Sequence, residues 1–208
     1  PEFSTYNEIE ICAMQPDLWV TASGKRFCDE TIGFWDTHVG NANARVGRNG
    51  YTWSLMDDSI FGGLMRDGIA KNISVEFLPG YKPVNVLQEI QAAIDNGSTE
   101  LVAADSLEEL AAKMGTDPVV LRATVDDYND ACSRGHDRLF AKDRKYLRPL
   151  LGPRYYAVKA RTVFLGTMGG IKTNEHMEVL DKKEAVIPGL YAGGFDAGSA
   201  APGERVLG

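Results

Sequence analysis

Two short glycine runs in the last fifty residues are the segments best suited to chemistry. They are 166–171 (GTMGGI) and 187–194 (IPGLYAGG), and each follows an apolar or aromatic stretch that predicts a strand. Glycine lets a backbone adopt positive φ or approach another group closely. Two such loops indicate a flat or charged group lying against the backbone. A tight turn is the commoner reason for Gly-Gly after a strand, so both interpretations stay open.

The cysteines and histidines favour neither a metal centre nor a disulfide framework. The sequence contains three of each, and they form no C-x-x-C pair and show no ligand spacing. An odd, scattered set of thiols is typical of free buried cysteines. We therefore expect no metal site. The residues concerned are Cys12, Cys28, Cys132, His38, His136 and His176.

Composition excludes several classes of partner. The 208 residues are 44% hydrophobic and 25% charged, with a formal net charge of −7. Nucleic acid is not an expected partner, because phosphate binding needs a basic surface. No apolar run approaches the roughly 20 residues of a membrane span. No secretory signal is visible, so the compartment of the parent, cytoplasm or cell envelope, stays open. Residues 1–4 and 200–208 are open to interpretation as vector-derived sequence.

The elements that would carry the glycine runs are a mixture of strands and helices. Residues 5–14 predict an edge strand, and 17–29 predict a hairpin that turns at Ser23-Gly24. The stretch 31–50 predicts a loop region with a short helix over 41–46. Further strands are expected over 50–56, 101–104, 155–160, 162–165 and 177–181.

Helix boundaries are marked more clearly than strand boundaries. Asp57-Asp58 offers a cap for a short helix, and 86–94 carries one apolar face that ends before Asn-Gly. Ser106 and Glu109 form a capping box. Asp117 supplies the cap, and Pro118 the first residue, of a further helix.

Several short motifs occur in a fixed order between residues 19 and 198. The hairpin reads WVTASGKRFCDE over 19–30. It is followed by SLEELA (106–111), DP (117–118), GHD (135–137), YLRP (146–149), YYA (155–157) and the two glycine runs. This order resembles the FAD flavoproteins of the fumarate reductase/succinate dehydrogenase superfamily. The most similar branch is that of the single-chain bacterial reductases and 3-ketosteroid dehydrogenases.

The resemblance implies an α+β capping (substrate) domain over 5–155. Residues 156–208 would be strands that return to the FAD-binding domain. In the family that domain begins with a strand, a G-x-G-x-x-G turn and a helix whose N-terminus stabilises the pyrophosphate. No G-x-G-x-x-G occurs in this sequence. We therefore expect FAD in a larger parent, weak or absent FAD and no activity in the isolated chain, and the remainder of the FAD domain as its partner.

Two substrate-binding positions of the family carry uncharged residues here. The histidine that precedes T-M-G-G in fumarate reductases corresponds to Gly166, which is followed by Thr167. The proton-donating arginine after the hairpin corresponds to Phe34, beside Trp35. The resemblance therefore implies substrate contacts at these four residues without the charges that fumarate needs.

Two charged site candidates come from aligning this sequence with the family's motifs without gaps. Glu10 falls on the glutamate of the family's T-E-A-x-x-R segment, although Ala13 falls on its arginine. Arg205 falls on the arginine of a later H-G-A-N-R motif and is the catalytic candidate. Neither neighbourhood shares more of the motif, so a chance match stays open for Glu10 and a divergent or vector-derived tail for Arg205.

The resemblance implies flavin contacts from both glycine runs. Those expected at the isoalloxazine are Met168, Gly169 and Gly170, and those expected at the nucleotide are Ala192, Gly193 and Gly194. The glutamate that follows the second run in relatives is Phe195 here. Asp196 comes next and is expected to take a related role.

The substrate class is inferred from the cationic side chains of the family's fumarate site that this sequence lacks. Three of the four groups that bind fumarate have no counterpart, and an unpaired buried carboxylate costs about 2–5 kcal/mol. Fumarate is therefore a poor substrate, whereas an α,β-unsaturated carbonyl or an aromatic acid fits better. Phe34, Trp35 and Tyr156 would supply apolar walls, and core packing is the alternative role for these aromatics.

The implied function is FAD-dependent hydride transfer at flavin N5, to or from a C–C bond next to a carbonyl or carboxylate. A small-molecule substrate is the expected ligand. The alternative is a non-catalytic α+β module that makes only interdomain or subunit contacts. The electron donor and the oligomeric state stay open.

Overall fold

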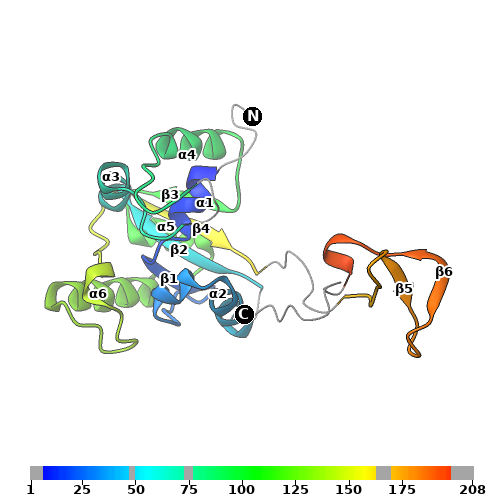
Figure 1. Ribbon diagram of the computed structural model, residues 1–208. Coiled ribbons are helices and arrows are strands. Elements are labelled where there is room, and N and C mark those ends of the chain that lie inside the picture. Colours follow the sequence, from blue (N-terminus) through cyan, green and yellow to red (C-terminus); the bar gives the residue numbers. More distant parts are fainter. Residues whose placement is uncertain (1–6, 47–49, 73–76, 163–169, 198–208) are drawn as a thin grey trace. The chain divides into compact units, whose positions relative to one another are not determined.

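A four-stranded antiparallel sheet organises the first part of the chain in the computed structural model, which describes residues 7–46, 50–72, 77–162 and 170–197. The strand order is β1-β2-β4-β3 (Figure 1). The strands are β1 Leu18–Thr21, β2 Thr52–Asp57, β3 Leu101–Ala104 and β4 Tyr155–Ala160. Leu55 in β2 pairs with Leu18 on one side and Ala157 on the other. All six residues of β2 are buried, because both faces of the sheet are covered.

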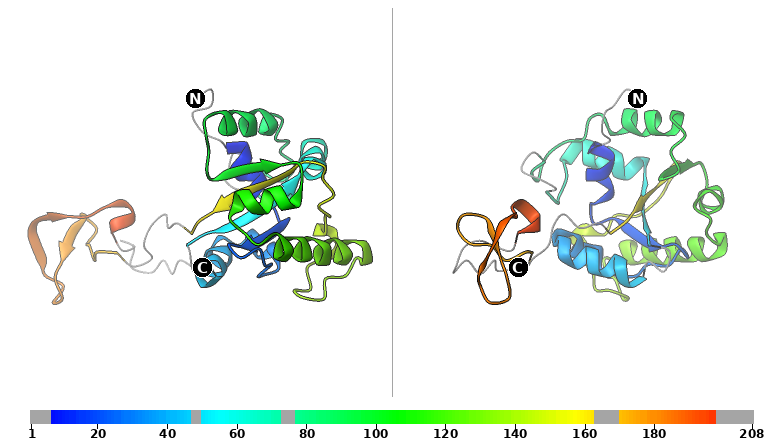
Figure 2. Two further views of the ribbon diagram at one scale, coloured as in Figure 1. Left: turned by 180° about the vertical axis from the view of Figure 1, so that it is seen from behind. Right: turned by 90° about the vertical axis from the view of Figure 1, so that its right-hand side faces the viewer.

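Helices pack on the two sides of this sheet. They are α1 Asn7–Ala13, α2 Asp36–Val46, α3 Asp58–Asp67, α4 Val86–Asp95, α5 Leu107–Met114 and α6 Pro118–Arg134, with short 3-10 turns η1 Glu30–Phe34 and η2 Arg144–Tyr146. Helices α1 and α4 lie on one side and α6 on the other (Figures 1 and 2). Helix α5 packs against β3, β4 and α6. The predicted α+β class is confirmed.

Capping side chains fix three helix starts where the sequence predicts them. Asp57 accepts from the backbone N–H of Ile60 at 2.9 Å. Ser106 Oγ accepts from the N–H of Glu109 at 3.1 Å, and Asp117 caps α6. Each cap satisfies a backbone donor that the first helical turn leaves without a partner.

The predicted edge strand over 5–14 is wrong, because this segment forms α1. Its start is held by contacts from distant parts of the chain. Glu8 accepts a hydrogen bond from Tyr81 Oη at 2.7 Å, and the N–H of Ile9 donates to Glu89 Oε2 at 3.0 Å. Alternating isoleucines favour a strand locally, and tertiary contacts override that preference.

Three other boundaries differ from the expectation. Helix α2 is longer than the predicted 41–46, since it starts at Asp36. The second strand of the hairpin is reduced to one antiparallel bridge between Val20 and Arg26. Of the predicted strand 162–165, residues 163–165 lie outside the described residues.

The chain divides into two compact units, 1–162 and 163–208. In the second unit, β5 Glu178–Leu180 and β6 Val186–Tyr191 form an antiparallel pair, followed by the 3-10 turn η3 Gly194–Asp196. Asp181 Oδ1 accepts from the N–H groups of Lys183 and Ala185 at 2.7 and 2.9 Å, which closes the hairpin turn. All residues of β6 are exposed.

The division falls after 162, whereas the sequence predicts a second segment that starts at 156. Strand β4 explains the difference, since it lies between β2 and β3 and is hydrogen-bonded to both. Residues 156–160 are therefore central to the first unit's sheet.

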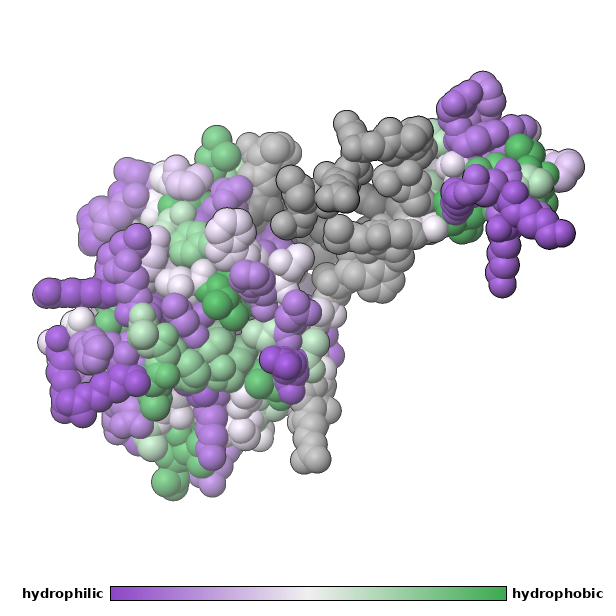
Figure 3. All heavy atoms as spheres, turned by 60° about the horizontal axis from the view of Figure 1, so that its bottom comes forward, coloured by the Kyte–Doolittle hydropathy of each residue, from purple (hydrophilic) through white to green (hydrophobic). Residues whose placement is uncertain are grey.

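One continuous core fills the first unit, with residues from α1, the four strands and α3 to α6. Apolar residues are interspersed with polar ones on the face turned forward in Figure 3, as on ordinary protein surfaces. Among the described residues, no helix combines the length and apolarity needed to cross a bilayer.

Candidate functional site

Much of the first glycine run lies outside the described residues. This holds for Gly166, Thr167, Met168 and Gly169, and also for the catalytic candidate Arg205. Gly170 is described, as are the backbone positions of the second run. The part of the candidate site that the structure describes is therefore Gly170 together with the loop that follows β6, in the second unit.

The end of β6 and the residue that follows the first glycine run surround one open hollow in the second unit. Its volume is about 610 Å³, and it is lined by Gly170, Ile171, Tyr191, Ala192, Gly193 and Asp196. The N–H of Ile171 donates to the carbonyl of Asp196 at 2.8 Å, in a parallel bridge that reaches Ala197. The structure thus brings together four of the residues expected to contact flavin.

Glycine is required at 170 by the chain itself. A Cβ there would collide with the carbonyl oxygen of Asp196 and would lie 2.7 Å from the carbonyl carbons of Asp196 and Ala197. Real Cβ atoms do not approach backbone that closely. Gly170 is therefore explained by the close approach of two backbone segments of the chain and not by a tight turn.

Gly193 has no such explanation among the described residues. Its φ is −150°, which any residue adopts, and a Cβ would meet nothing within 4 Å. Gly194 differs, because its φ of +63° favours glycine. The backbone at Gly193 is therefore open to close approach as far as the described residues show. The exposed carboxylate of Asp196 lines the same hollow and has no partner among the described residues.

The aromatic candidates of the first unit fall into different environments. Phe34 is half-buried, with its ring centroid 5.3 Å from that of Tyr146. Trp35 is 66% exposed, and its ring lies 6.3 Å from that of His38. Trp35 is thus free to contact a ligand, whereas Phe34 is partly committed to packing. Glu10 is exposed on α1, and its carboxylate has no partner in the described part of the chain.

Tyr156 is a core residue, so of the two roles left open for it the structure supports core packing and not a substrate wall. Its side chain is buried in β4 and packs edge-on against Phe61, with ring centroids 5.1 Å apart. Its hydroxyl donates to Asp58 Oδ1 at 2.7 Å. Burial and this hydrogen bond together raise the pKa of Tyr156.

A buried network of charges joins the hairpin to α6, and the spacing of its residues in the sequence does not predict it. Arg26 donates through Nε and Nη2 to both carboxylate oxygens of Glu30, each at 2.7 Å. Its Nη1 lies 2.8 Å from Asp137 Oδ2. The guanidinium also lies over the rings of Tyr128 and Phe140, at 5.1 and 5.0 Å from their centroids.

Lys142 and Asp17 extend the network. Lys142 Nζ lies 3.1 Å from Glu30 Oε2 and donates to Tyr128 Oη at 2.9 Å and to the carbonyl of Asp17 at 2.7 Å. Arg148 pairs with the Asp17 carboxylate at 2.7 Å. Burial lowers the pKa of Lys142 against the opposing effect of Glu30, and burial raises the pKa of Asp17 against that of Arg148.

The network explains why the hairpin and G-H-D motifs are recognisable. Its side chains are at most 4% exposed, except that of Arg148 at 32%. Buried charges need partners, and here three cations face three carboxylates. These motif residues therefore hold the hairpin, α6 and the following loop together and are not free to bind a substrate.

A comparison with protein-family models finds one match over residues 5–208, to the model described as FAD binding domain. Curated relatives are reductases. Vinyl phenol reductase of Lactiplantibacillus plantarum is 31% identical over 183 residues, which cover 88% of this chain and 36% of that protein. Fumarate reductase (cytochrome) of Shewanella frigidimarina is 30% identical over 191 residues, which cover 92% of this chain and 28% of that protein. The chain thus spans about a third of these relatives.

Solved structures show the same fold. The open conformation of a flavocytochrome c3 fumarate reductase superposes with a TM-score of 0.64 at 23% identity, over 92% of this chain and 29% of that one. The 3-ketosteroid Δ1-dehydrogenase of Sterolibacterium denitrificans superposes with a TM-score of 0.57 at 25% identity, over 90% of this chain and 34% of that one.

Proposed function

Because the chain belongs to the FAD binding domain family of fumarate reductase-like flavoproteins, we propose that it is part of an FAD-dependent reductase or dehydrogenase. The reaction adds or removes hydrogen across a C–C bond next to a carbonyl or carboxylate. The match to the FAD binding domain model over nearly the whole chain carries this proposal. The first unit corresponds to the capping domain, and the second unit supplies strands of the FAD-binding domain.

Residues at the hollow of the second unit would hold part of the flavin nucleotide. When bound, FAD supplies the two-electron chemistry of the reaction. Gly193 leaves its backbone open to close approach, and Asp196 presents an acceptor-only carboxylate suited to a ribose hydroxyl. Gly170, with Met168 and Gly169, would face the isoalloxazine.

The substrate we propose is an α,β-unsaturated carbonyl compound or an aromatic acid, not fumarate. Phe34 stands where fumarate reductases place a proton-donating arginine, so a second carboxylate would lack a partner. Trp35 offers an exposed apolar surface. Gly166 and Thr167 are the other proposed substrate contacts. Arg205 is the catalytic cation of this proposal, and Glu10 a further polar contact. Two relatives, an NADH:acrylate oxidoreductase and a urocanate reductase, are named for unsaturated carboxylates, which supports an unsaturated acid as substrate.

In isolation the chain is proposed to bind FAD weakly and to be inactive. A dinucleotide pyrophosphate is normally held at a G-x-G-x-x-G turn and helix N-terminus, and no such turn occurs in these 208 residues. The alternative function, a non-catalytic interaction module, is supported by the first unit's own continuous core. The two proposals differ in what the longer parent protein does.

A viologen-linked reductase assay on the full-length parent tests the proposal. We expect bound FAD, and a higher kcat/KM for cinnamate-like acids than for fumarate. Trp35→Ala should raise KM for the aromatic acids, whereas Leu78→Ala, an exposed apolar residue outside the site, should not. A flavin-free parent would support the non-catalytic module. A preference for fumarate would overturn the substrate class but leave the reductase assignment standing.

A further inference from the structure

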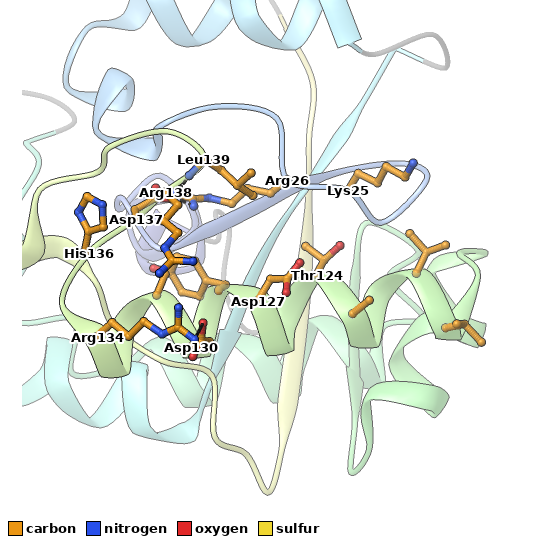
Figure 4. Close-up of a pocket in the computed structure, with 15 residues that line it drawn as sticks. Lys25, Arg26, Thr124, Asp127, Asp130, Arg134, His136, Asp137, Arg138 and Leu139 are labelled. Atoms are coloured by element: carbon orange, nitrogen blue, oxygen red, sulfur yellow. Dashed lines mark hydrogen bonds and ion pairs between the residues drawn. The ribbon is translucent and has the colours of Figure 1, made fainter.

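A second hollow lies in the first unit, and the proposed reaction does not use it. Its volume is about 630 Å³, between α6, the loop that carries Lys25 and Arg26, and residues 136–139. Figure 4 shows Asp127 and Thr124 on α6 beneath Lys25 and Arg26, with Arg138 reaching down from the loop that follows α6. All of these residues belong to the first unit.

The charges beneath the hollow are already neutralised. Arg26 is bound to Glu30 and Asp137, and its side chain is 4% exposed. At the surface, Arg134 is paired with Asp130 at 3.0 Å. None of these groups needs a ligand to satisfy its charge.

Three charged groups that line the hollow lack such partners. The side chains of Lys25, Asp127 and Arg138 make no hydrogen bond or ion pair within the described part of the chain. Figure 4 places Lys25 toward one end and Arg138 toward the other, with Asp127 between them on α6. The free charges therefore run positive, negative, positive along the hollow.

Exposed apolar side chains also line this hollow. Val119 is 75% exposed and Leu139 is 68% exposed, and each lies on a different element. A ligand with a short aliphatic body would cover part of this surface, which favours binding. A bare phosphate or a nucleic acid fits poorly, because the carboxylate of Asp127 would repel it.

We propose that the hollow binds a free dicarboxylic α-amino acid of the glutamate type. Its α-carboxylate pairs with the Arg138 guanidinium, in the bidentate geometry that arginine favours. Its ammonium pairs with Asp127, and its distal carboxylate with Lys25. The methylenes cover part of the apolar lining of the hollow. This site is independent of the proposed reductase chemistry.

Titration of the ¹⁵N-labelled chain with L-glutamate, glutarate and L-norvaline tests the proposal. L-glutamate should shift the amide signals of the hollow. Glutarate lacks the ammonium and norvaline lacks the distal carboxylate, so each should bind about tenfold more weakly. No shift with millimolar L-glutamate, or equal affinity for glutarate, would overturn the proposal.

Two charge variants and one control sharpen the result. Asp127→Asn should weaken L-glutamate about tenfold while leaving glutarate unchanged or tighter, because it removes the ammonium partner and a repulsive charge together. Arg138→Ala should weaken both ligands. Arg154→Ala, an exposed arginine outside the hollow, should change neither. If Asp127→Asn weakened both ligands equally, general disruption would explain the loss and the assignment of Asp127 would fail.

Discussion

Two glycines that look alike in sequence have different physical reasons to be glycine. Gly170 is confined by the backbone of Asp196 and Ala197, whereas Gly193 faces open space at an unstrained φ. The first requirement belongs to the fold of the second unit. Nothing among the described residues requires glycine at 193, and a bound flavin is the reason we propose for it.

Alanine at each position should separate these reasons. Gly170→Ala should break the hydrogen bond from Ile171 to Asp196, because the new Cβ cannot fit against that backbone. Hydrogen exchange at the Ile171 amide should accelerate. Gly193→Ala should leave this exchange unchanged in the isolated chain, but lower the flavin content of the full-length parent. If both variants kept full flavin content, Gly193 would have no part in binding it.

Lys142 gives a prediction about the buried charges. Its ammonium is fully buried and touches Glu30, Tyr128 and the carbonyl of Asp17. Lys142→Met keeps the length of the side chain but leaves three carboxylates facing two cations. We expect a loss of about 3–5 kcal/mol in the free energy of unfolding, measured by urea denaturation.

Lys145 is the matched control for Lys142. Its side chain is 63% exposed, and its ion pair with Asp143 is 3.5 Å long. Such surface pairs contribute little to stability, so Lys145→Met should leave the urea midpoint almost unchanged. Equal effects of the two substitutions would show that the buried network does not stabilise the fold.

At the scale of elements, local signals predicted the helices whose ends are set by nearby side chains. Ser106, Glu109 and Asp117 act within one turn of the helix they start, so sequence spacing is sufficient to find them. Helix α1 is held by contacts of another kind. Its Glu8 and Ile9 bind groups more than 70 residues away, and spacing alone does not reveal such contacts.

The residues of the candidate site, too, could be predicted from the sequence only in part. The glycine runs stood out because glycine followed predicted strands, and the structure brings Gly170 near Gly193. Asp137 did not stand out as a partner of Arg26, since the two are distant in the sequence. For Tyr156 the sequence left two roles open, because a tyrosine in a strand gives no sign of which side is covered.

At the scale of the whole molecule, the position of β4 decides where the first unit ends. All six of its residues pair with β2, and four of them, 155–158, also pair with β3. The core residues Tyr156 and Ala157 come from this strand. The unit that extends to 162 contains all four strands. This makes the boundary testable by truncation.

A chain truncated after residue 162 should fold alone, whereas one truncated after residue 155 should not. The shorter chain lacks nearly all of β4, so β2 and β3 lose the strand that joins them and their backbone groups lose partners. Dispersed ¹H–¹⁵N spectra and a cooperative urea transition are expected for 1–162 only. A folded 1–155 would show that β4 is dispensable and that the second segment begins at 156. Failure of both to fold, with the full chain folded, would show instead that the first unit depends on residues beyond 162.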